Sequence, residues 1–205
     1  MDERALEAYL QRHICGPLGM HDTSFVGRDE WASRSAAVHH RQPDGSVAPA
    51  DQPAAAPPEF HRGGGGLSST GPDYIRFLRM LLAEGELDGA RILAPETVAL
   101  MGRNAVGDLA VPILRSRNPD FAQEFDMFPG QVKKWGLSFL MNTEDVPGGR
   151  GAGSLAWAGI FNTHFWIDPK RRVAALLLMQ LLPFQDAAAM GLLAAFERAV
   201  YTGRT

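Results

Sequence analysis

Hydrophobic residues recur every three or four positions in three separate stretches of the chain. This spacing places apolar side chains on one face of a helix, with polar residues on the rest of each turn. The helices predicted from this spacing are Asp2–Ile14, Gly71–Gly85 and Gln185–Tyr201, and a further short helix, Pro95–Met101, is predicted from the proline near its first position. Gly16 and Pro17 end the first helix. Thr70, with Asp73 three residues later, resembles a capping box at the start of the second.

The last third of the chain carries shorter apolar runs, which Gly, Pro and Asp-Pro turns separate. The predicted strands are Trp135–Asn142, Ser154–Trp157, Asn162–Asp168 and Val173–Leu182. Because the connections between them are short, we expect an antiparallel meander. The order of helices, strands and a closing helix predicts an α+β fold, in which helices, the C-terminal one included, pack on the sheet.

Two stretches, residues 25–61 and 103–134, have neither a helical nor a strand period. We interpret both as surface excursions from a single domain that spans residues 1–205. The first is polar and favours a short hairpin around Asp44 and Gly45. The second carries scattered aromatic residues and is expected to be an inserted, partly helical lid or loop.

Composition narrows the classes of protein that the chain can be. Hydrophobic residues make up 45% of the 205 positions, and 20 basic against 23 acidic residues leave a net charge of -3. No basic block is present, so we expect no nucleic-acid partner. Cys15 is the single cysteine and is interpreted as a small core residue rather than a nucleophile.

Neither a membrane span nor a secretion signal is visible in the sequence. The longest apolar run, Val173–Leu182, is about half of the ~20 residues that a spanning helix needs. Residues Met1–Arg4 carry acids where a signal peptide has a basic region. We therefore expect a soluble chain, cytoplasmic by default, while the compartment itself stays open.

The glycine run and the histidines could each indicate a ligand site, but the further residues that such a site requires are absent. Gly63–Gly66 precedes a helix as a phosphate loop does, but no Gly-Lys-Ser or Gly-Lys-Thr follows, which favours a simple backbone bend. The six histidines include no H-x-x-x-H pair and no nearby cysteine pair. We expect neither a metal nor another cofactor.

Local motifs of serine hydrolases are absent as well. None of the lysines Lys133, Lys134 and Lys170 has a serine three residues earlier, so no S-x-x-K is present. The G-x-S-x-G pattern fails at every serine.

Several segments in combination nevertheless resemble the serine β-lactamase-related superfamily, which contains class C β-lactamases, DD-peptidases and family VIII esterases. These segments are Pro17–Phe25, Gly64–Thr70, Asp73–Phe77, Trp157–Gly159 and Phe165–Pro169. Their order and spacing match over nearly the whole chain. The resemblance implies a partial β-lactamase-like fold, in which the chain corresponds to the C-terminal portion of the family's domain.

The family's S-x-x-K helix and Tyr-x-Asn loop lie upstream of the matching region and are not encoded here. The three tyrosines Tyr9, Tyr74 and Tyr201 are not followed two residues later by asparagine. The catalytic residues of this chain are therefore unknown, and the chain is expected to be inactive by itself.

Trp157–Gly159 resembles the family's third motif, which is Lys-Thr-Gly or, in esterases, Trp-x-Gly on the strand that borders the cleft. The usual esterase form has glycine where Ala158 stands. The resemblance implies that Trp157, Ala158 and Gly159 bind substrate, and that the N–H of Ile160 supplies half of an oxyanion hole. Tryptophan in place of the cationic lysine favours a small ester over a β-lactam. The alternative for Trp157 is a packing role within the sheet.

In the family the last strand pairs with the first strand of the domain, which is missing here. Val173–Leu182 would then be an unpaired, apolar edge. We expect a second chain, or a second copy in a homodimer, to cover it. The leading interpretation is the C-terminal segment of a serine hydrolase that acts on an ester or amide. The alternative is a non-catalytic binding or assembly module that keeps the family's scaffold.

Overall fold

A five-stranded antiparallel sheet forms the centre of the protein. The computed structural model describes residues 5–50 and 60–203. The strands follow one another in space as they do in sequence, in the order β5 (Lys133–Trp135), β6 (Leu140–Asn142), β7 (Leu155–Gly159), β8 (Thr163–Asp168) and β9 (Val173–Leu177). Every neighbouring pair is antiparallel. The predicted antiparallel meander is confirmed.

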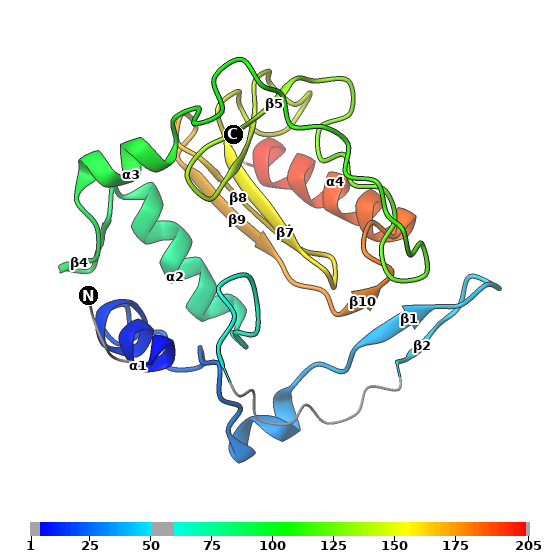
Figure 1. Cartoon of the computed structure of the whole chain (residues 1–205), viewed down its shortest axis with the longest axis horizontal. Helices are drawn as coiled ribbons and strands as arrows, with labels where there is room; N and C mark the ends of the chain where they lie inside the picture. The colour runs from blue at the N-terminus through cyan, green and yellow to red at the C-terminus, as the bar shows by residue number, and fades with distance from the viewer. Residues whose placement is uncertain (1–4, 51–59, 204–205) are drawn as a thin grey trace.

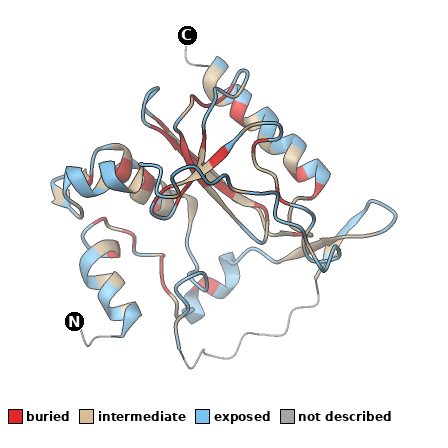
Figure 2. Ribbon diagram, turned by 45° about the horizontal axis from the view of Figure 1, so that its top comes forward, coloured by how far each residue is buried: buried red, intermediate tan, exposed pale blue. Residues whose placement is uncertain are grey.

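Helices lie on both faces of this sheet (Figure 1). Helices α2 (Gly71–Leu82) and α3 (Pro95–Met101) lie on one side, and α4 (Ala187–Thr202) lies across the other. Alternate residues of β8 point to opposite faces, so Ile167 joins the apolar cluster under α2 while Trp166 joins the cluster under α4. Buried residues gather on the strands and on the helix surfaces that face them (Figure 2). The α+β fold class is confirmed.

One of the two hydrogen bonds of the predicted capping box is present at the start of α2. Thr70 Oγ1 accepts a hydrogen bond from the N–H of Asp73 at 3.3 Å. The Asp73 carboxylate does not return to the Thr70 backbone. It accepts instead from the N–H of Asp22 at 2.7 Å and from Thr23 Oγ1 at 2.9 Å. Asp73 therefore ties α2 to a distant segment rather than closing a local box.

The first helix is shorter than predicted in its regular part. Helix α1 spans Leu6–Leu10 and continues as a π-helical turn over Gln11–Cys15. The predicted start at Asp2 lies outside the described residues. Cys15 is 3% exposed in the cluster under α2, which confirms its interpretation as a core residue. None of the described helices is long and apolar enough to cross a bilayer.

The excursion over residues 25–61 contains the predicted hairpin, formed by β1 (His39–Arg41) and β2 (Val47–Pro49). This hairpin extends away from the central sheet (Figure 1). It follows a short 3-10 helix, Asp29–Arg34. A further two-residue pair, β3 (Glu86–Leu87) and β4 (Ala90–Arg91), follows α2 and has no counterpart in the sequence predictions.

The prediction of partial helix in residues 103–134 is wrong. This segment contains no helix and is held by isolated contacts, among them a bridge between Leu114 and Phe125. Phe125 and Phe128 are 7% and 4% exposed and join the cluster under α4. The scattered aromatic residues therefore anchor an irregular segment to the sheet, which needs no helical period.

Two predicted strands are each interrupted. Trp135–Asn142 is a hairpin of β5 and β6, because Ser138 takes a positive φ of 96° and the backbone at Gly136 approaches the Met101 carbonyl too closely for any side chain. Val173–Leu182 breaks after Leu177, and its last two residues form β10 (Leu181–Leu182), which pairs in parallel with β1.

The break after β9 has a hydrogen-bonding cause. The carbonyl of Met179 accepts from Thr163 Oγ1, that of Gln180 from the N–H of His39, and that of Leu181 from Asn162 Nδ2. The bond from His39 begins the pairing of this segment with β1, and the other two donors are the side chains of Asn162 and Thr163 at the turn from β7 to β8. Among the described residues β9 pairs with β8 alone, so it forms an edge of the sheet.

Candidate functional site

The candidate site lies at the C-terminal end of β7. Strand β8 pairs with β7 along its whole length, from Leu155 to Gly159. Strand β6 pairs with it only at Leu155 and Ala156. The stretch from Trp157 to Gly159 therefore has a strand on one side and, within the described chain, an open edge on the other. An open edge offers backbone N–H and C=O groups to a ligand.

A pocket of about 230 Å³ adjoins this edge. All four site residues that the sequence suggested, Trp157, Ala158, Gly159 and Ile160, line it. The opposite wall is built by the irregular segment after α3 and by the turn before α4. Those lining residues are Leu114, Arg115, Ser116, Ala122, Gln123, Phe125 and Phe184.

Trp157 both packs and lines the pocket. Its ring lies edge-on to Trp135, with 4.7 Å between ring centroids, and edge-on to Phe125 at 5.5 Å. It is half-buried, whereas Trp166 on the next strand is fully buried and donates its Nε1–H to Tyr201 Oη at 3.1 Å. The two alternatives for Trp157 are thus not exclusive, whereas Trp166 is a packing residue.

The turn between β7 and β8 is fixed by Asn162. This residue is fully buried with a positive φ of 62°, a conformation that asparagine tolerates better than most residues. Its Nδ2 donates to the carbonyls of Leu181 and Pro183 at 2.9 and 2.8 Å, and its Oδ1 accepts from the N–H of Gln185 at 2.8 Å. Three side-chain hydrogen bonds therefore hold Asn162, two residues after Ile160, against residues 181–185.

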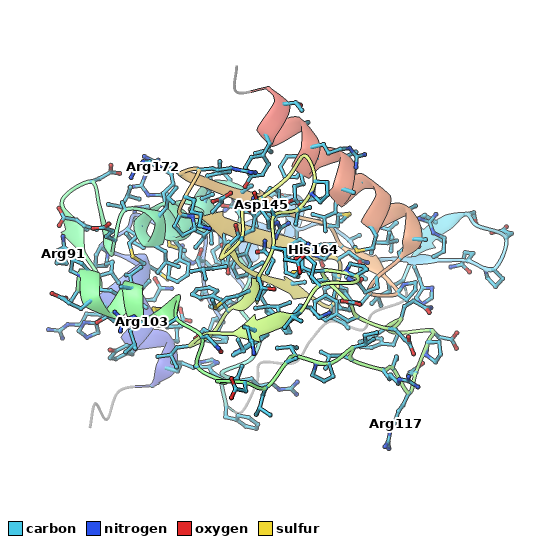
Figure 3. All side chains as sticks on the ribbon, turned by 90° about the horizontal axis from the view of Figure 1, so that it is seen from above. Arg91, Arg103, Arg117, Asp145, His164 and Arg172 are labelled. Carbon is cyan, nitrogen blue, oxygen red and sulfur yellow. The ribbon has the colours of Figure 1, made fainter. Side chains whose placement is uncertain are left out.

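Two buried side chains of nucleophilic type, His164 and Cys15, are not among the residues that line this pocket. Burial holds the pKa of His164, whose Cα pairs with that of Ala158, at about 4, so its ring is neutral at pH 7. Figure 3 shows His164 among the side chains of the interior, with Arg117 at the periphery. Burial also raises the pKa of Cys15 to about 11, which leaves its thiol protonated. Arg115 is the charged residue of the pocket wall.

The glycine run is a turn followed by Gly66, whose φ of 105° requires glycine and whose backbone lies against the ring of Phe25. This geometry matches the predicted bend. Within residues 5–50 and 60–203, no three His, Cys, Asp or Glu side chains lie close enough together to hold a metal ion.

The sequence did not suggest the opposite wall of the pocket. Leu114, Phe125 and Phe184 come from stretches without periodicity, and no motif marks them. Asn162 had a weak signal, because asparagine at a strand end is common in tight turns. Its three tertiary hydrogen bonds depend on the segment near residue 183, which sequence spacing does not reveal.

Comparisons with known proteins bear on this arrangement. A family model described as Beta-lactamase matches residues 1–199. Protein Rv1367c of Mycobacterium tuberculosis is 34% identical, over 92% of this chain and 47% of its own length. Monacolin J acid methylbutanoyltransferase of Aspergillus terreus is 32% identical, over 96% and 49%. Lovastatin esterase of Penicillium rubens is 28% identical, over 96% and 50%.

A solved structure extends the likeness to the whole fold described here. Simvastatin Synthase from Aspergillus terreus superposes with a TM-score of 0.83 at 30% identity and covers 98% of this chain and 51% of that chain. The chain therefore spans about half the length of the curated relatives and of the structure that it matches.

Proposed function

The chain belongs to the β-lactamase family, and from that premise we propose that it supplies one wall of the substrate cleft of a serine acyl-transfer enzyme. One observation carries the proposal: the four residues 157–160 line a single pocket at the open edge of β7. Acyltransferases and an esterase among the relatives support this class of reaction.

The proposed chemistry proceeds through an acyl-serine. A serine Oγ attacks the ester carbonyl, the alcohol leaves with a proton, and water or an acceptor hydroxyl then takes the acyl group from the serine. The N–H of Ile160 donates to the carbonyl oxygen as negative charge develops on it. Asn162 is a positioning residue for this donor. Trp157 takes the place of a cationic lysine, which favours neutral esters over β-lactams.

The nucleophile and its base are supplied by residues outside this sequence, since the 205 residues contain neither S-x-x-K nor Tyr-x-Asn. We therefore expect the purified chain to leave p-nitrophenyl butyrate intact. Protein from its native source, treated with a fluorophosphonate probe that labels activated serines, should give a labelled species near twice 22.3 kDa or a labelled second chain that co-purifies. An unlabelled 22.3 kDa chain alone would refute the proposal.

The second candidate function is a binding or assembly module, and the open edge of β9 favours it. Both faces of β9 are covered, since Val173 and Ala175 pack under α4 and Ala174 and Leu176 pack under α2. Its outer edge has no strand beside it among the described residues. A second chain, or a second copy of this one, would extend the sheet there. Analytical ultracentrifugation tests this: a monodisperse monomer at high concentration contradicts it.

A further inference from the structure

A second cavity, of about 210 Å³, also has Trp157 in its wall. Apolar side chains build nearly all of its wall. The lining residues are Val111, Pro112, Leu114, Phe125, Met127, Lys133, Trp135, Leu140 and Trp157. The exception is Lys133, whose ammonium is bound to the Asp126 carboxylate at 2.6 Å and whose side chain is 7% exposed. Because this charge is paired, the cavity presents a hydrophobic interior.

The two cavities are neighbours that share Leu114, Phe125 and Trp157 in their walls. The first contains the backbone of residues 158–160 together with the polar side chains of Arg115, Ser116 and Gln123. The second lacks such groups apart from the paired lysine. An ester has the same division, with a polar reacting carbonyl joined to an apolar chain.

The volume of the second cavity limits what can enter it. Engineered protein cavities of about 150 Å³ with apolar walls bind benzene, a molecule of six carbon atoms. A cavity of about 210 Å³ therefore has room for roughly eight carbon atoms. Each methylene buried in such a space strengthens binding about four-fold.

We propose that this second cavity binds the aliphatic chain of an ester, with up to about eight carbon atoms, while the ester carbonyl lies in the first cavity beside Ile160. Trp157 lines both cavities and would contact both parts of the ligand. The placement of the carbonyl rests on the proposed acyl transfer. Binding of the chain does not, because every residue that lines the cavity belongs to the described chain.

The test uses the purified chain and a series of ethyl esters from acetate through butanoate, hexanoate and octanoate to decanoate and dodecanoate. Because Trp135 and Trp157 line the cavity, their fluorescence reports occupancy. We expect the Kd to fall about four-fold for each added methylene until the cavity is full, and to level off at about eight carbons.

A matched pair of variants tests the location. Val111→Trp fills the cavity from its wall and should abolish the dependence of Kd on chain length. Ile113→Trp introduces the same side chain two residues later, at a position that is 47% exposed and lines neither cavity, and should preserve the dependence of Kd on chain length. Far-UV circular dichroism is the control that both variants fold. Equal Kd values across the ester series in the unaltered chain, or equal losses in the two variants, would overturn the proposal.

Two isomeric esters distinguish the source of the chain. Ethyl hexanoate carries six carbons on the acyl side, and hexyl acetate carries them on the alcohol side. Tighter binding of one isomer identifies which side enters the cavity, and both results support chain binding. The same esters are then tested for turnover with this chain combined with the residues that supply the nucleophile and base. Turnover that does not depend on chain length would refute chain binding in the second cavity and leave the proposed acyl transfer standing. Chain-length-dependent binding without any turnover would refute acyl transfer and leave chain binding standing.

Discussion

Strand β8 carries two buried polar side chains on the same face, and their surroundings differ completely. Asp168, 1% exposed, uses both carboxylate oxygens: Oδ2 accepts from the N–H of Gly151 at 2.8 Å and from Tyr201 Oη at 3.0 Å, and Oδ1 accepts from the N–H of Arg171 at 3.0 Å. His164 is 2% exposed, and neither ring nitrogen has a hydrogen-bond partner within the described residues.

The residues that surround Asp168 and His164 differ in the same way. Near Asp168, the Arg150 guanidinium binds Glu197 of α4 through two hydrogen bonds, at 2.8 and 2.6 Å, and lies 4.4 Å from the centre of the Trp166 ring. Near His164, the neighbours include the ring of Phe184 and the open end of β7. Buried polar groups are normally paired. At the Asp168 end of β8 the buried polar groups find hydrogen-bond partners within the chain, and we call this the satisfied end. The His164 end, where the ring nitrogens have no partner among the described residues, is the unpaired end, and it is the end at which we place the ligand.

The largest effect is expected from breaking the satisfied end. In Glu197→Gln, Arg150 stays buried at 3% exposure without its counter-charge. Removal of one partner of a buried ion pair costs about 3 to 5 kcal/mol. We expect the free energy of unfolding, measured in urea by far-UV circular dichroism, to fall by that amount.

Two further variants show whether charge is the cause. Glu96→Gln changes an exposed acid on α3 and should alter stability by less than about 0.5 kcal/mol. The double replacement Arg150→Met with Glu197→Leu removes both charges and should cost less than Glu197→Gln alone. A double variant that is less stable than the single one would contradict this account.

The unpaired end should show its effect in acid. Burial, and secondarily the charge of Arg150, lower the pKa of His164 to about 4, below the ordinary 6.5. Between these two pH values the unfolded chain binds one more proton than the folded chain. The free energy of unfolding therefore falls by about 1.4 kcal/mol for each pH unit as the pH falls. His164→Phe removes both the titration and the unpaired nitrogens.

We expect His164→Phe to be more stable than the unaltered chain already at pH 7, and the gap to widen by about 3 kcal/mol towards pH 4. Urea titrations of both proteins at pH 7, 5.5 and 4 measure it. Parallel pH profiles would show that His164 has a partner or is charged in the folded state.

The contrast between the two ends also marks how far the sequence predicts the fold. Periodicity located α2 and α4 closely, because each packs one apolar face on the sheet, and the proline near its first position marked α3, whose bounds match the prediction. It could not locate the breaks at Ser138 and after Leu177. Those breaks depend on contacts with Met101, His39 and other residues distant in the sequence, which local patterns do not encode.

The candidate site follows the same rule. The resemblance to a family motif pointed to residues 157–160, of which Trp157–Gly159 lie on β7 and Ile160 follows in the turn, and all four line the pocket. The wall that faces them was missed, since Leu114 and Phe125 belong to an irregular segment in which burial, not periodicity, chooses the residues. The pairing of Arg150 with Glu197 was missed for a similar reason, because 47 positions separate the two residues.

The smallest effect concerns a single hydroxyl group at the satisfied end. Tyr201 Oη accepts a hydrogen bond from Trp166 Nε1 at 3.1 Å and donates one to Asp168 at 3.0 Å. Burial raises the pKa of this phenol above its ordinary value, so the hydroxyl keeps its proton and remains a donor. Tyr201→Phe keeps the ring but leaves the Trp166 N–H without an acceptor. Asp168 retains two backbone donors, so the expected loss is about 1 to 2 kcal/mol. Tyr9→Phe, at a side chain 39% exposed, should change the unfolding free energy by less than about 0.5 kcal/mol. Equal effects of the two replacements would mean that the network around Asp168 adds nothing beyond packing, and the contrast with His164 would then lose its energetic basis.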